Sequence, residues 1–366
     1  MDTVNDPTDA VHVRGLRVRT VCVPLPEPHR TASGVITESP LVLVDVLTDA
    51  GVEGHGLAFT YTRAALGPTA QFIRQLEPLI AGEPLAPAAL EQRLARRFRL
   101  LGTQGLVGMA LAAVDMALWD ALARRHAVPL AALLGGAPRP IRAYGAVGYD
   151  GELQSARVAE DWARRGFGGV KAKIGYPDVR EDLAVVRAMR QAVGPDVAIM
   201  VDYNQSLEPA DAVERLRRLD DEGLAWIEEP TLAHDFVGHA RIAREIRTPI
   251  QCGENWWGAL DFQHAIDAQA SDHMMPDAMK VGGVTGWLRV AALAQPRGIR
   301  LSSHLWPELS AQLLSVTPTA HWLEYADWWN PILRDPLVIE QGVARPTDRA
   351  GSGCAWNQNA VDAYLV

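Results

Sequence analysis

Three acidic residues recur at intervals of 26 positions along the middle of the chain: Asp202, Glu228 and Glu254. Each stands at or just after the end of an apolar run rich in β-branched residues. This even alternation of strand, helix and strand is typical of a parallel α/β barrel. Carboxylates at three successive strand ends would meet at one mouth of the barrel and repel one another. A hard divalent cation such as Mg²⁺ takes oxygen ligands, so the spacing predicts a metal site there.

The alternation continues on both sides of these residues. Helical stretches, for instance at 179–193, separate apolar runs that fit a single barrel, and no clear helix follows the last run. We predict an α/β fold with an α+β unit over 1–139, a barrel over 140–325, and a segment 326–366 that returns to the N-terminal unit. The predicted barrel strands are 141–147, 168–174, 197–202, 224–228, 249–254, 274–281 (weakened by Pro276), 299–304 and 319–325.

Composition restricts the partner and the compartment. The formal net charge of −9 argues against nucleic acid and anionic membranes as partners. The apolar stretch 106–123 is interrupted by two aspartates, so we interpret it as a buried helix and not as a membrane span. The acidic residues 1–10 lack the apolar core of a signal peptide, and Cys22, Cys252 and Cys354 have no metal-binding spacing. A reduced, cytoplasmic protein is the simplest interpretation.

Strands two and three add further polar residues. Side chains two apart on a strand share a face, so Lys171 and Lys173 point together, as do Asp202 and Asn204. Lysines inside a barrel must meet anions, because desolvation would otherwise neutralise them. The alternative for this pair is a solvated strand edge. We expect Asn204 to hydrogen-bond a substrate hydroxyl.

The remaining strand ends suggest acid–base chemistry. Asp277 and His304 come from adjacent strands, so Asp277 would orient the imidazole and raise its basicity. Glu324 is either a protonated acid that donates to a developing negative oxygen or a partner for a lysine of strand two. Of two adjacent glutamates, the 26-residue interval selects Glu228 as the ligand and leaves Glu229 a supporting or structural role.

The order around the barrel indicates a reaction. Strands two and seven lie well apart, so a substrate held by the metal would meet Lys173 on one face and His304 on the other. Two bases on opposite faces of one carbon can remove a proton from one side and return it to the other. The metal would stabilise the intermediate enediolate by on the order of several kcal/mol. We expect Lys171 and the cation to lower the pKa of Lys173 so that it can accept a proton.

Seven motifs together resemble the mandelate racemase subgroup of the enolase superfamily: VKAKIGY, VDYNQSL, WIEEPTL, GENWWG, MPDAMKVGGVTGW, SSHL and HWLE. The resemblance covers nearly the whole chain and is densest over 168–325. It implies a (β/α)₇β TIM-like barrel, an N-terminal α+β capping domain, and C-terminal strands that complete the cap. It also implies a small-molecule carboxylate substrate, one Mg²⁺ per subunit that Mn²⁺ can replace, and a homo-oligomer, often an octamer.

The resemblance also implies a role for each site residue. Two residues would be the bases for the two enantiomers of the substrate, and the others would bind the substrate or the metal. The implied roles are Lys173 as the base for the S enantiomer, His304 with Asp277 as the base for the R enantiomer, Lys171 and Glu324 as carboxylate-binding residues, Asn204 as the partner of the α-hydroxyl, and Asp202, Glu228 and Glu254 as the Mg²⁺ ligands.

Two stretches depart from the subgroup, and both concern substrate recognition. Ala146 stands where the subgroup has a serine that contacts the substrate carboxylate. The segment 26–39 matches a largely apolar flap over the pocket, yet here it carries His29, Arg30 and Ser33. A more polar acid, such as a sugar acid, would fit under this flap.

Two reactions share the predicted first step. One is racemisation of a mandelate-like 2-hydroxy acid by 1,1-proton transfer. The other is dehydration of a sugar acid to a 2-keto-3-deoxy acid, in which His304 expels a 3-hydroxyl after Lys173 or His304 removes the α-proton. A barrel that binds metal and ligand without turnover is a third hypothesis.

Overall fold

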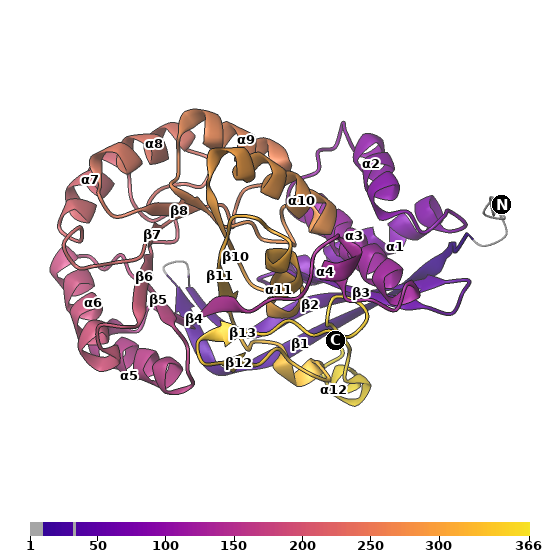
Figure 1. Ribbon diagram of the computed structural model, residues 1–366, viewed down its shortest axis with the longest axis horizontal. Coiled ribbons are helices and arrows are strands. Elements are labelled where there is room, and N and C mark those ends of the chain that lie inside the picture. Colours follow the sequence, from indigo (N-terminus) through magenta and orange to yellow (C-terminus); the bar gives the residue numbers. More distant parts are fainter. Residues whose placement is uncertain (1–9, 32–33) are drawn as a thin grey trace.

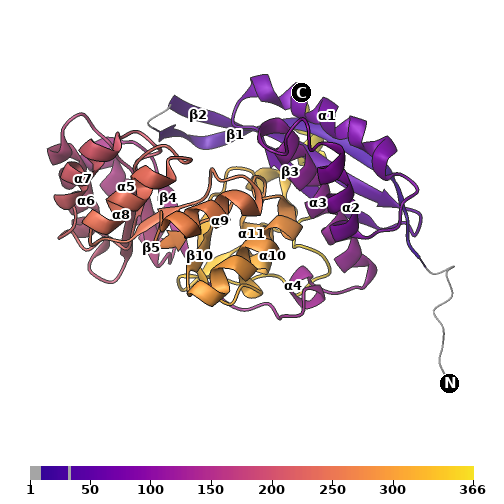
Figure 2. The same cartoon turned by 90° about the horizontal axis from the view of Figure 1, so that it is seen from above.

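The structure, a computed structural model, describes residues 10–31 and 34–366. Ser33 of the predicted flap, and nearly all of the N-terminal stretch that argued against a signal peptide, lie outside the described residues. The described chain forms a closed barrel beside an antiparallel sheet with helices packed on it (Figure 1, Figure 2). The predicted fold class is therefore confirmed.

Eight parallel strands make the barrel, which closes because the last strand pairs with the first. Helices cover the outer face of the strands, and for this reason the strand sequences are apolar nearly throughout. The strands are β4 (Ile141–Val147), β5 (Gly169–Lys173), β6 (Ala198–Asp202), β7 (Ile227–Glu228), β8 (Ile250–Cys252), β9 (His273–Met274), β10 (Arg300–Ser303) and β11 (Ala320–Tyr325).

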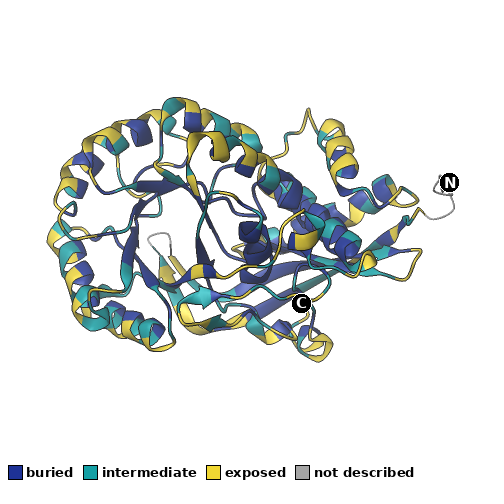
Figure 3. Cartoon of the chain, in the orientation of Figure 1, coloured by how far each residue is buried: buried dark blue, intermediate teal, exposed yellow. Residues whose placement is uncertain are grey.

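Seven α-helices of the described chain alternate with these strands, and most turn an exposed face outward and a buried face to the barrel (Figure 3). A short 3₁₀ turn (Asn330–Ile332) follows β11 in place of an eighth helix, which gives the (β/α)₇β form. The helices are α5 (Gly151–Arg164), α6 (Val179–Val193), α7 (Pro209–Arg217), α8 (Phe236–Glu245), α9 (Gly258–Ala268), α10 (Gly283–Ala294), which a 3₁₀ turn (Gln295–Arg297) extends, and α11 (Pro307–Ser315).

The sixth predicted strand, 274–281, is wrong over most of its length. β9 ends at Met274, and the following residues leave the sheet and turn. Pro276 has no backbone N–H to offer to a strand ladder. The Asp277 carboxylate also accepts a hydrogen bond from the backbone N–H of Met279 at 2.7 Å. This local turn replaces strand pairing and places Asp277 beside the end of β10.

The N-terminal part is a three-stranded antiparallel sheet with helices packed on it. Gly54 and Gly56 let α3 (Gly105–Arg125) approach β3 (Glu53–Phe59) closely, because an added Cβ on either would lie 2.2 Å from a carbonyl oxygen of α3. α3 is long and apolar enough to cross a membrane, but 78% of its apolar window is buried, so it is a core helix as predicted. The elements are β1 (Val13–Thr31), β2 (Gly34–Thr48), β3 (Glu53–Phe59), α1 (Arg63–Ile80), α2 (Pro87–Arg97), α3 (Gly105–Arg125) and α4 (Leu130–Leu133).

The chain after the barrel contacts both other parts. β12 (Ile339–Glu340) and β13 (Val343–Ala344) form a hairpin, and β13 pairs with barrel strand β4. Beyond α12 (Gln358–Ala363), the backbone N–H of Val366 donates to the carbonyl of Thr20 on β1 at 3.1 Å. The hairpin thus extends the barrel sheet, while the end of the chain pairs with β1 of the cap, where Leu365 forms an antiparallel bridge with Val21.

A buried aspartate joins the cap to the barrel. Asp115 on α3 accepts hydrogen bonds from the backbone N–H (3.0 Å) and the hydroxyl (2.5 Å) of Thr285 in the first turn of α10. Gly283 permits this contact, because an added Cβ would lie 2.3 Å from the carboxylate and its φ of +71° suits glycine. Burial raises the pKa of Asp115 to about 7.

We expect Asp115→Ala to lower the free energy of unfolding by about 2–3 kcal/mol, because buried polar groups of Thr285 lose their partner. Urea denaturation followed by circular dichroism measures the change. Asp267→Ala, at an exposed position of α9, is the control and should change the free energy by less than about 0.5 kcal/mol. An unchanged stability of Asp115→Ala would contradict the proposed link.

The same carboxyl group predicts a pH dependence of stability. Its pKa is about 7 in the folded protein and about 4 in an unfolded chain, so between these values the folded state retains a proton that the unfolded state has released. The contribution of Asp115 to the free energy of unfolding therefore falls as the pH rises from about 4 to about 7, and it is constant above about pH 7. Asp115→Asn does not titrate, so its stability relative to wild type should increase between pH 5 and pH 8 in urea titrations.

Candidate active site and metal centre

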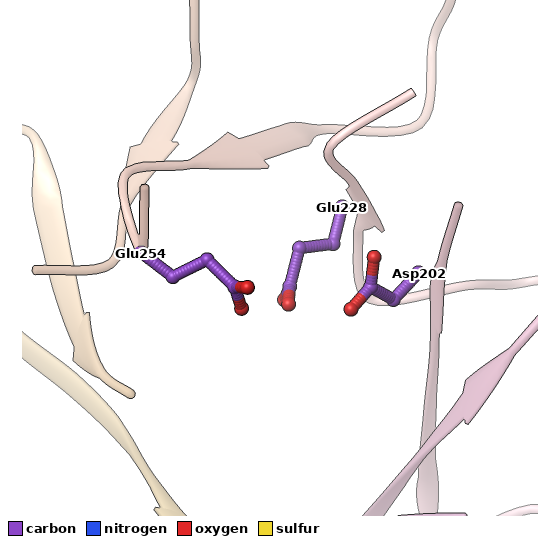
Figure 4. Close-up of side chains that lie close together, drawn as sticks. All are labelled: Asp202, Glu228 and Glu254. Atoms are coloured by element: carbon purple, nitrogen blue, oxygen red, sulfur yellow. The ribbon is translucent and has the colours of Figure 1, made fainter. Parts of the chain in front are cut away.

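Three carboxylates from adjacent strands converge at the barrel mouth. Asp202 ends β6, Glu228 ends β7, and Glu254 lies two residues after β8. All three are buried, and one oxygen from each lies within 4.8 Å of the others. Figure 4 shows Glu228 between the other two, as the strand order requires. The convergence predicted from the 26-residue interval is confirmed.

This set of oxygen donors fits a hard divalent cation. Oε2 of Glu254 is buried and makes no hydrogen bond, although Nε2 of His304 lies 3.2 Å from it; a cation would supply the bond that this carboxylate oxygen lacks. Burial raises the pKa of Glu228 well above its ordinary value, and the charges of Asp202 and Glu254 add to this despite the opposing effect of Lys171. Positive charge among the three carboxylates is therefore needed to keep them all ionised.

Two lysines from β5 reach the same carboxylates, as strand alternation predicted. Lys171 contacts Glu228, and its Nζ also lies 2.8 Å from Glu324 and 3.8 Å from Asp202. Lys173 contacts Asp202. Both lysines are buried, so the alternative of a solvated strand edge is excluded.

The expected lowering of the pKa of Lys173 depends on the cation as well as on Lys171, and it stays a prediction for the metal-bound site. Burial is the largest influence and favours a lower pKa, as does Lys171, but the charges of Asp202, Glu254 and Glu228 together raise the pKa above its ordinary value. The contact of Lys173 with Asp202 joins β5 to β6 and is not evident from the sequence of either strand. Lys173 can act as a base only when another cation takes over the charge of Asp202.

His304 approaches the carboxylates from the other end of the row. Its Nδ1 lies 2.7 Å from Oδ2 of Asp277, and its Nε2 lies 3.2 Å from Oε2 of Glu254. Asp277 thereby fixes the proton on Nδ1 and leaves Nε2 facing the site. Burial alone would lower the pKa of His304, but the charges of Glu254, Glu324 and Asp277 raise it overall.

Glu324 occupies the second of the two roles considered for it. Its Oε1 lies 2.8 Å from Nζ of Lys171, and its Oε2 accepts a hydrogen bond from the backbone N–H of Leu305 at 3.1 Å. Burial opposes ionisation, but the charges of Lys171, His304 and Lys173 lower the pKa of Glu324 to about 2. Glu324 is therefore the partner of Lys171 here, and a protonated Glu324 that donates to a bound substrate stays a prediction.

Asn204 reaches the site by a backbone path that simple strand alternation does not describe. β6 ends at Asp202, and Asn204 adopts a left-handed φ of +44°. Its backbone N–H and its Nδ2 donate to the two oxygens of Asp202 at 2.7 and 3.1 Å. Its Oδ1 is buried without a partner, which leaves an acceptor for a ligand hydroxyl.

Two supports of the metal site were missed from the sequence. Nε1 of Trp226 donates to Oε2 of Glu228 at 3.0 Å, and Nε2 of Gln251 lies 3.3 Å from the same oxygen. Trp226 belongs to a separate buried cluster with Tyr144, Met200 and Trp322. Because Trp226 stands two positions before Glu228, strand alternation was a signal that could have identified it.

Glu229 has the supporting position predicted for it. Its left-handed φ of +39° separates its side chain from that of the metal ligand before it. Both its oxygens accept from Nδ2 of Asn255, at 3.0 and 2.8 Å, and Gln205 donates to one of them at 3.2 Å. Burial, with the charges of Glu254 and Asp202, raises the pKa of Glu229 to about 8.

The flap strand β1 carries His29 to the edge of the site. Its ring lies 5.0 Å from the ring of Trp328, measured between centroids, and its imidazole has no hydrogen bond within the part of the chain that the structure describes. Burial, with the charges of Lys173 and Lys171, lowers its pKa to about 3, so the ring is neutral. A cavity of about 280 Å³ lies between the flap and α5, and both His29 and Ala146 line it.

Comparison with known protein families agrees with this geometry. Residues 14–135 match the mandelate racemase/muconate lactonizing enzyme N-terminal domain, and residues 154–360 match the enolase C-terminal domain-like family. The chain belongs to the mandelate racemase/muconate lactonizing enzyme family of the enolase superfamily. Its fold and its three-carboxylate site make it a Mg²⁺-dependent member of that superfamily.

Relatives of this superfamily member catalyse more than one reaction. An enolase from Bradyrhizobium, solved in complex with magnesium and mandelic acid, is 45% identical with a TM-score of 0.93, covering 98% of this chain and 99% of that one. L-Talarate dehydratase from Polaromonas sp., solved with Mg and L-glucarate, is 31% identical with a TM-score of 0.91, covering 98% of both chains. L-Talarate/galactarate dehydratase of Salmonella typhimurium is 30% identical over 331 residues, 89% of this chain and 82% of that protein. The family is confirmed, and the racemase subgroup stays a prediction.

Proposed function

We propose that the protein is a Mg²⁺-dependent racemase that interconverts the enantiomers of a mandelate-like 2-hydroxy acid. One observation carries the proposal: Lys173 contacts Asp202 at one end of the carboxylate row, and His304 lies beside Glu254 at the other end. A ligand held over the row meets a basic group on each side. The Bradyrhizobium relative, which is 45% identical and was solved with magnesium and mandelic acid, supports this choice of substrate class.

The residues of the site divide the work of binding. Lys171, already paired with Glu324, is placed to donate to the substrate carboxylate. An anionic substrate competes for that ammonium group, which favours protonation of Glu324 and a hydrogen bond from Glu324 to the substrate. The free Oδ1 of Asn204 accepts from the α-hydroxyl. Mg²⁺ bound by Asp202 and its two partner carboxylates supplies positive charge that stabilises the negative charge developing on the substrate.

The two bases then exchange a proton across one carbon. Lys173 removes the α-proton of the S enantiomer, and His304, protonated on Nε2 and oriented by Asp277, delivers a proton to the opposite face. The R enantiomer reacts by the same steps in reverse. Each residue is therefore a base for one enantiomer and an acid for the other.

The experiment that tests the proposal is proton NMR in D₂O with Mg²⁺ and each enantiomer of mandelate. Racemisation replaces the α-hydrogen by deuterium and leaves the carbon skeleton intact, and polarimetry follows the loss of optical rotation. Absence of exchange with every 2-hydroxy acid tested, in protein that binds Mg²⁺, would refute the racemase.

Dehydration of a sugar acid is the second candidate, and the flap favours it. His29 presents a neutral imidazole with one free donor and one free acceptor at the edge of the site. Such a group suits a hydroxyl of the substrate better than a phenyl ring. Two relatives are dehydratases of hydroxylated acids by name. The same NMR experiment with a panel of sugar acids distinguishes this reaction, because dehydration yields a 2-keto-3-deoxy acid.

Replacement of His29 by valine tests what the flap recognises. We expect His29→Val to lower kcat/KM for a hydroxylated acid by about 10-fold or more, because a hydrogen bond to the substrate is lost, and to leave mandelate nearly unaffected. Arg30→Met is the control, since Arg30 pairs with Asp150 at 3.3 Å and is exposed. Equal losses on both kinds of acid would argue against recognition of a substrate hydroxyl by His29.

A further inference from the structure

The third lysine of the chain lies at the metal site and has no role in the proposed reaction. Lysine and arginine together number 35, and only three of these residues are lysine: Lys171, Lys173 and Lys280. Elsewhere the chain uses arginine for its cationic side chains. The guanidinium group of arginine is planar and spreads its donors over a fork, whereas the ammonium group of lysine is a compact charge with three donors on one atom. The use of lysine at 280 therefore suggests a specific contact rather than general surface charge.

Lys280 is buried in the turn that follows β9, with 6% of its surface exposed. Its Nζ donates a hydrogen bond to Oδ1 of Asn255 at 2.7 Å and lies 4.6 Å from the centre of the Tyr61 ring. The same turn carries Asp277, which orients His304. One short segment thus holds partners of both the imidazole base and the metal site.

The contact with Lys280 determines which way the Asn255 amide faces. An ammonium group has only donors, so the amide must present its oxygen to Lys280. The NH₂ group then faces the carboxylates and donates to both oxygens of Glu229, at 3.0 and 2.8 Å, and to Oε1 of Glu254 at 3.2 Å. If the amide were reversed, its oxygen would face two carboxylates and its NH₂ an ammonium group. Lys280 thereby excludes the reversed orientation.

Glu229 is a fixed anchor for this amide. Its backbone N–H donates to the carbonyl of Gln251 at 3.2 Å, and its own carbonyl accepts from the N–H of Gln205 at 2.8 Å. The residue is fully buried and adopts a left-handed φ of +39°, a strained conformation that the surrounding contacts maintain. Asn255 therefore joins Glu254, a metal-site carboxylate, to a rigid part of the barrel.

We propose that Lys280, Asn255 and Glu229 form a positioning relay that holds the Glu254 carboxylate in place to bind the metal. The inference rests on the metal site and does not depend on which acid the enzyme converts. Residues that support a metal ligand through hydrogen bonds typically contribute about 10–100-fold to metal affinity. Loss of any member of the relay therefore weakens Mg²⁺ binding.

Replacement of Lys280 by methionine separates positioning from simple electrostatics. If the lysine acted only through its charge, removing a cation near the site would strengthen Mg²⁺ binding, since like charges repel. The relay predicts the opposite, because the Asn255 amide loses the contact that fixes its orientation. We expect Lys280→Met to raise the Kd for Mg²⁺ by about 10-fold or more in isothermal titration calorimetry.

Arg289→Met is the matched control. Arg289 and Lys280 line the same cavity of about 290 Å³ between the cap and α10, but Arg289 pairs with Glu91 at 2.6 Å and does not touch Asn255. Its removal deletes one positive charge from the cavity wall and leaves the relay intact, so the Kd for Mg²⁺ should stay within about 2-fold. Lys280→Arg, which keeps a cationic donor, should recover part of the affinity.

A second variant keeps the test decisive if Lys280→Met does not fold. Asn255→Leu removes the amide at similar volume and should weaken Mg²⁺ binding to the same degree, and the double variant should bind no more weakly than either single variant. Thermal unfolding checks that each variant is folded. Unchanged or tighter Mg²⁺ binding in either folded single variant would overturn the proposal.

Discussion

Lys173→Ala should abolish racemisation and yet leave one exchange reaction in place. Loss of one acid–base residue lowers the rate by roughly 10²–10⁴-fold, so interconversion falls below detection. His304 remains paired with Asp277, and it can still remove and return the α-proton of the R enantiomer. In D₂O with Mg²⁺, the variant should therefore exchange the α-hydrogen of the R enantiomer and not that of the S enantiomer, as followed by proton NMR.

The reciprocal variant is the control for this assignment. His304→Asn should exchange only the S enantiomer, through Lys173, and should also fail to racemise. The two variants together test whether the bases lie on opposite faces of the substrate. Exchange of both enantiomers by either variant would show that a single residue serves both faces, and the two-base mechanism would be wrong.

Removal of the metal should have an equally large effect. Treatment with EDTA is expected to reduce turnover by about 10³-fold or more, because the cation stabilises the transition state by several kcal/mol. Added Mg²⁺ should restore the activity. At about 100 times the Kd, Mg²⁺ should also stabilise the folded protein by about 2.7 kcal/mol, which differential scanning calorimetry detects independently of turnover.

A substitution pair locates this metal effect. Asp202→Asn should lose both the activity and the stabilisation by Mg²⁺, since one of three converging carboxylates is neutralised. Asp178→Asn changes the half-buried N-cap carboxylate of α6, away from the metal site, and should respond to Mg²⁺ as wild type does. Retention of Mg²⁺-induced stabilisation in Asp202→Asn would place the metal elsewhere.

Strand alternation predicted the barrel and most of its site because both depend on local sequence. The interval between Asp202, Glu228 and Glu254 is set by the length of one strand–helix unit, and it identified the metal site. The spacing of Lys171 and Lys173 likewise placed both side chains inward. These features follow from the periodicity of strands and helices, which can be recognised in a single sequence.

Interactions between distant residues were not predictable in this way. The lowered pKa of Glu324 depends on Lys171, which lies on the far side of the intervening strand β4, and the raised pKa of Lys173 depends on Asp202 and the other two carboxylates. The position of Lys280 was missed as well, although the scarcity of lysine in the chain was a signal. The domain boundaries, the homo-oligomer and the cytoplasmic location stay predictions.

The turn after β9 has a consequence for engineering and for natural divergence of this enzyme. Asp277 and Lys280 lie three residues apart in this turn, and their side chains contact different residues of the site, His304 and Asn255. A single insertion or deletion in this loop would displace both Asp277, which orients the imidazole base, and Lys280, which supports the metal site. Libraries that seek a new substrate should therefore leave this loop intact and vary the β1–β2 hairpin, which carries His29 at the rim.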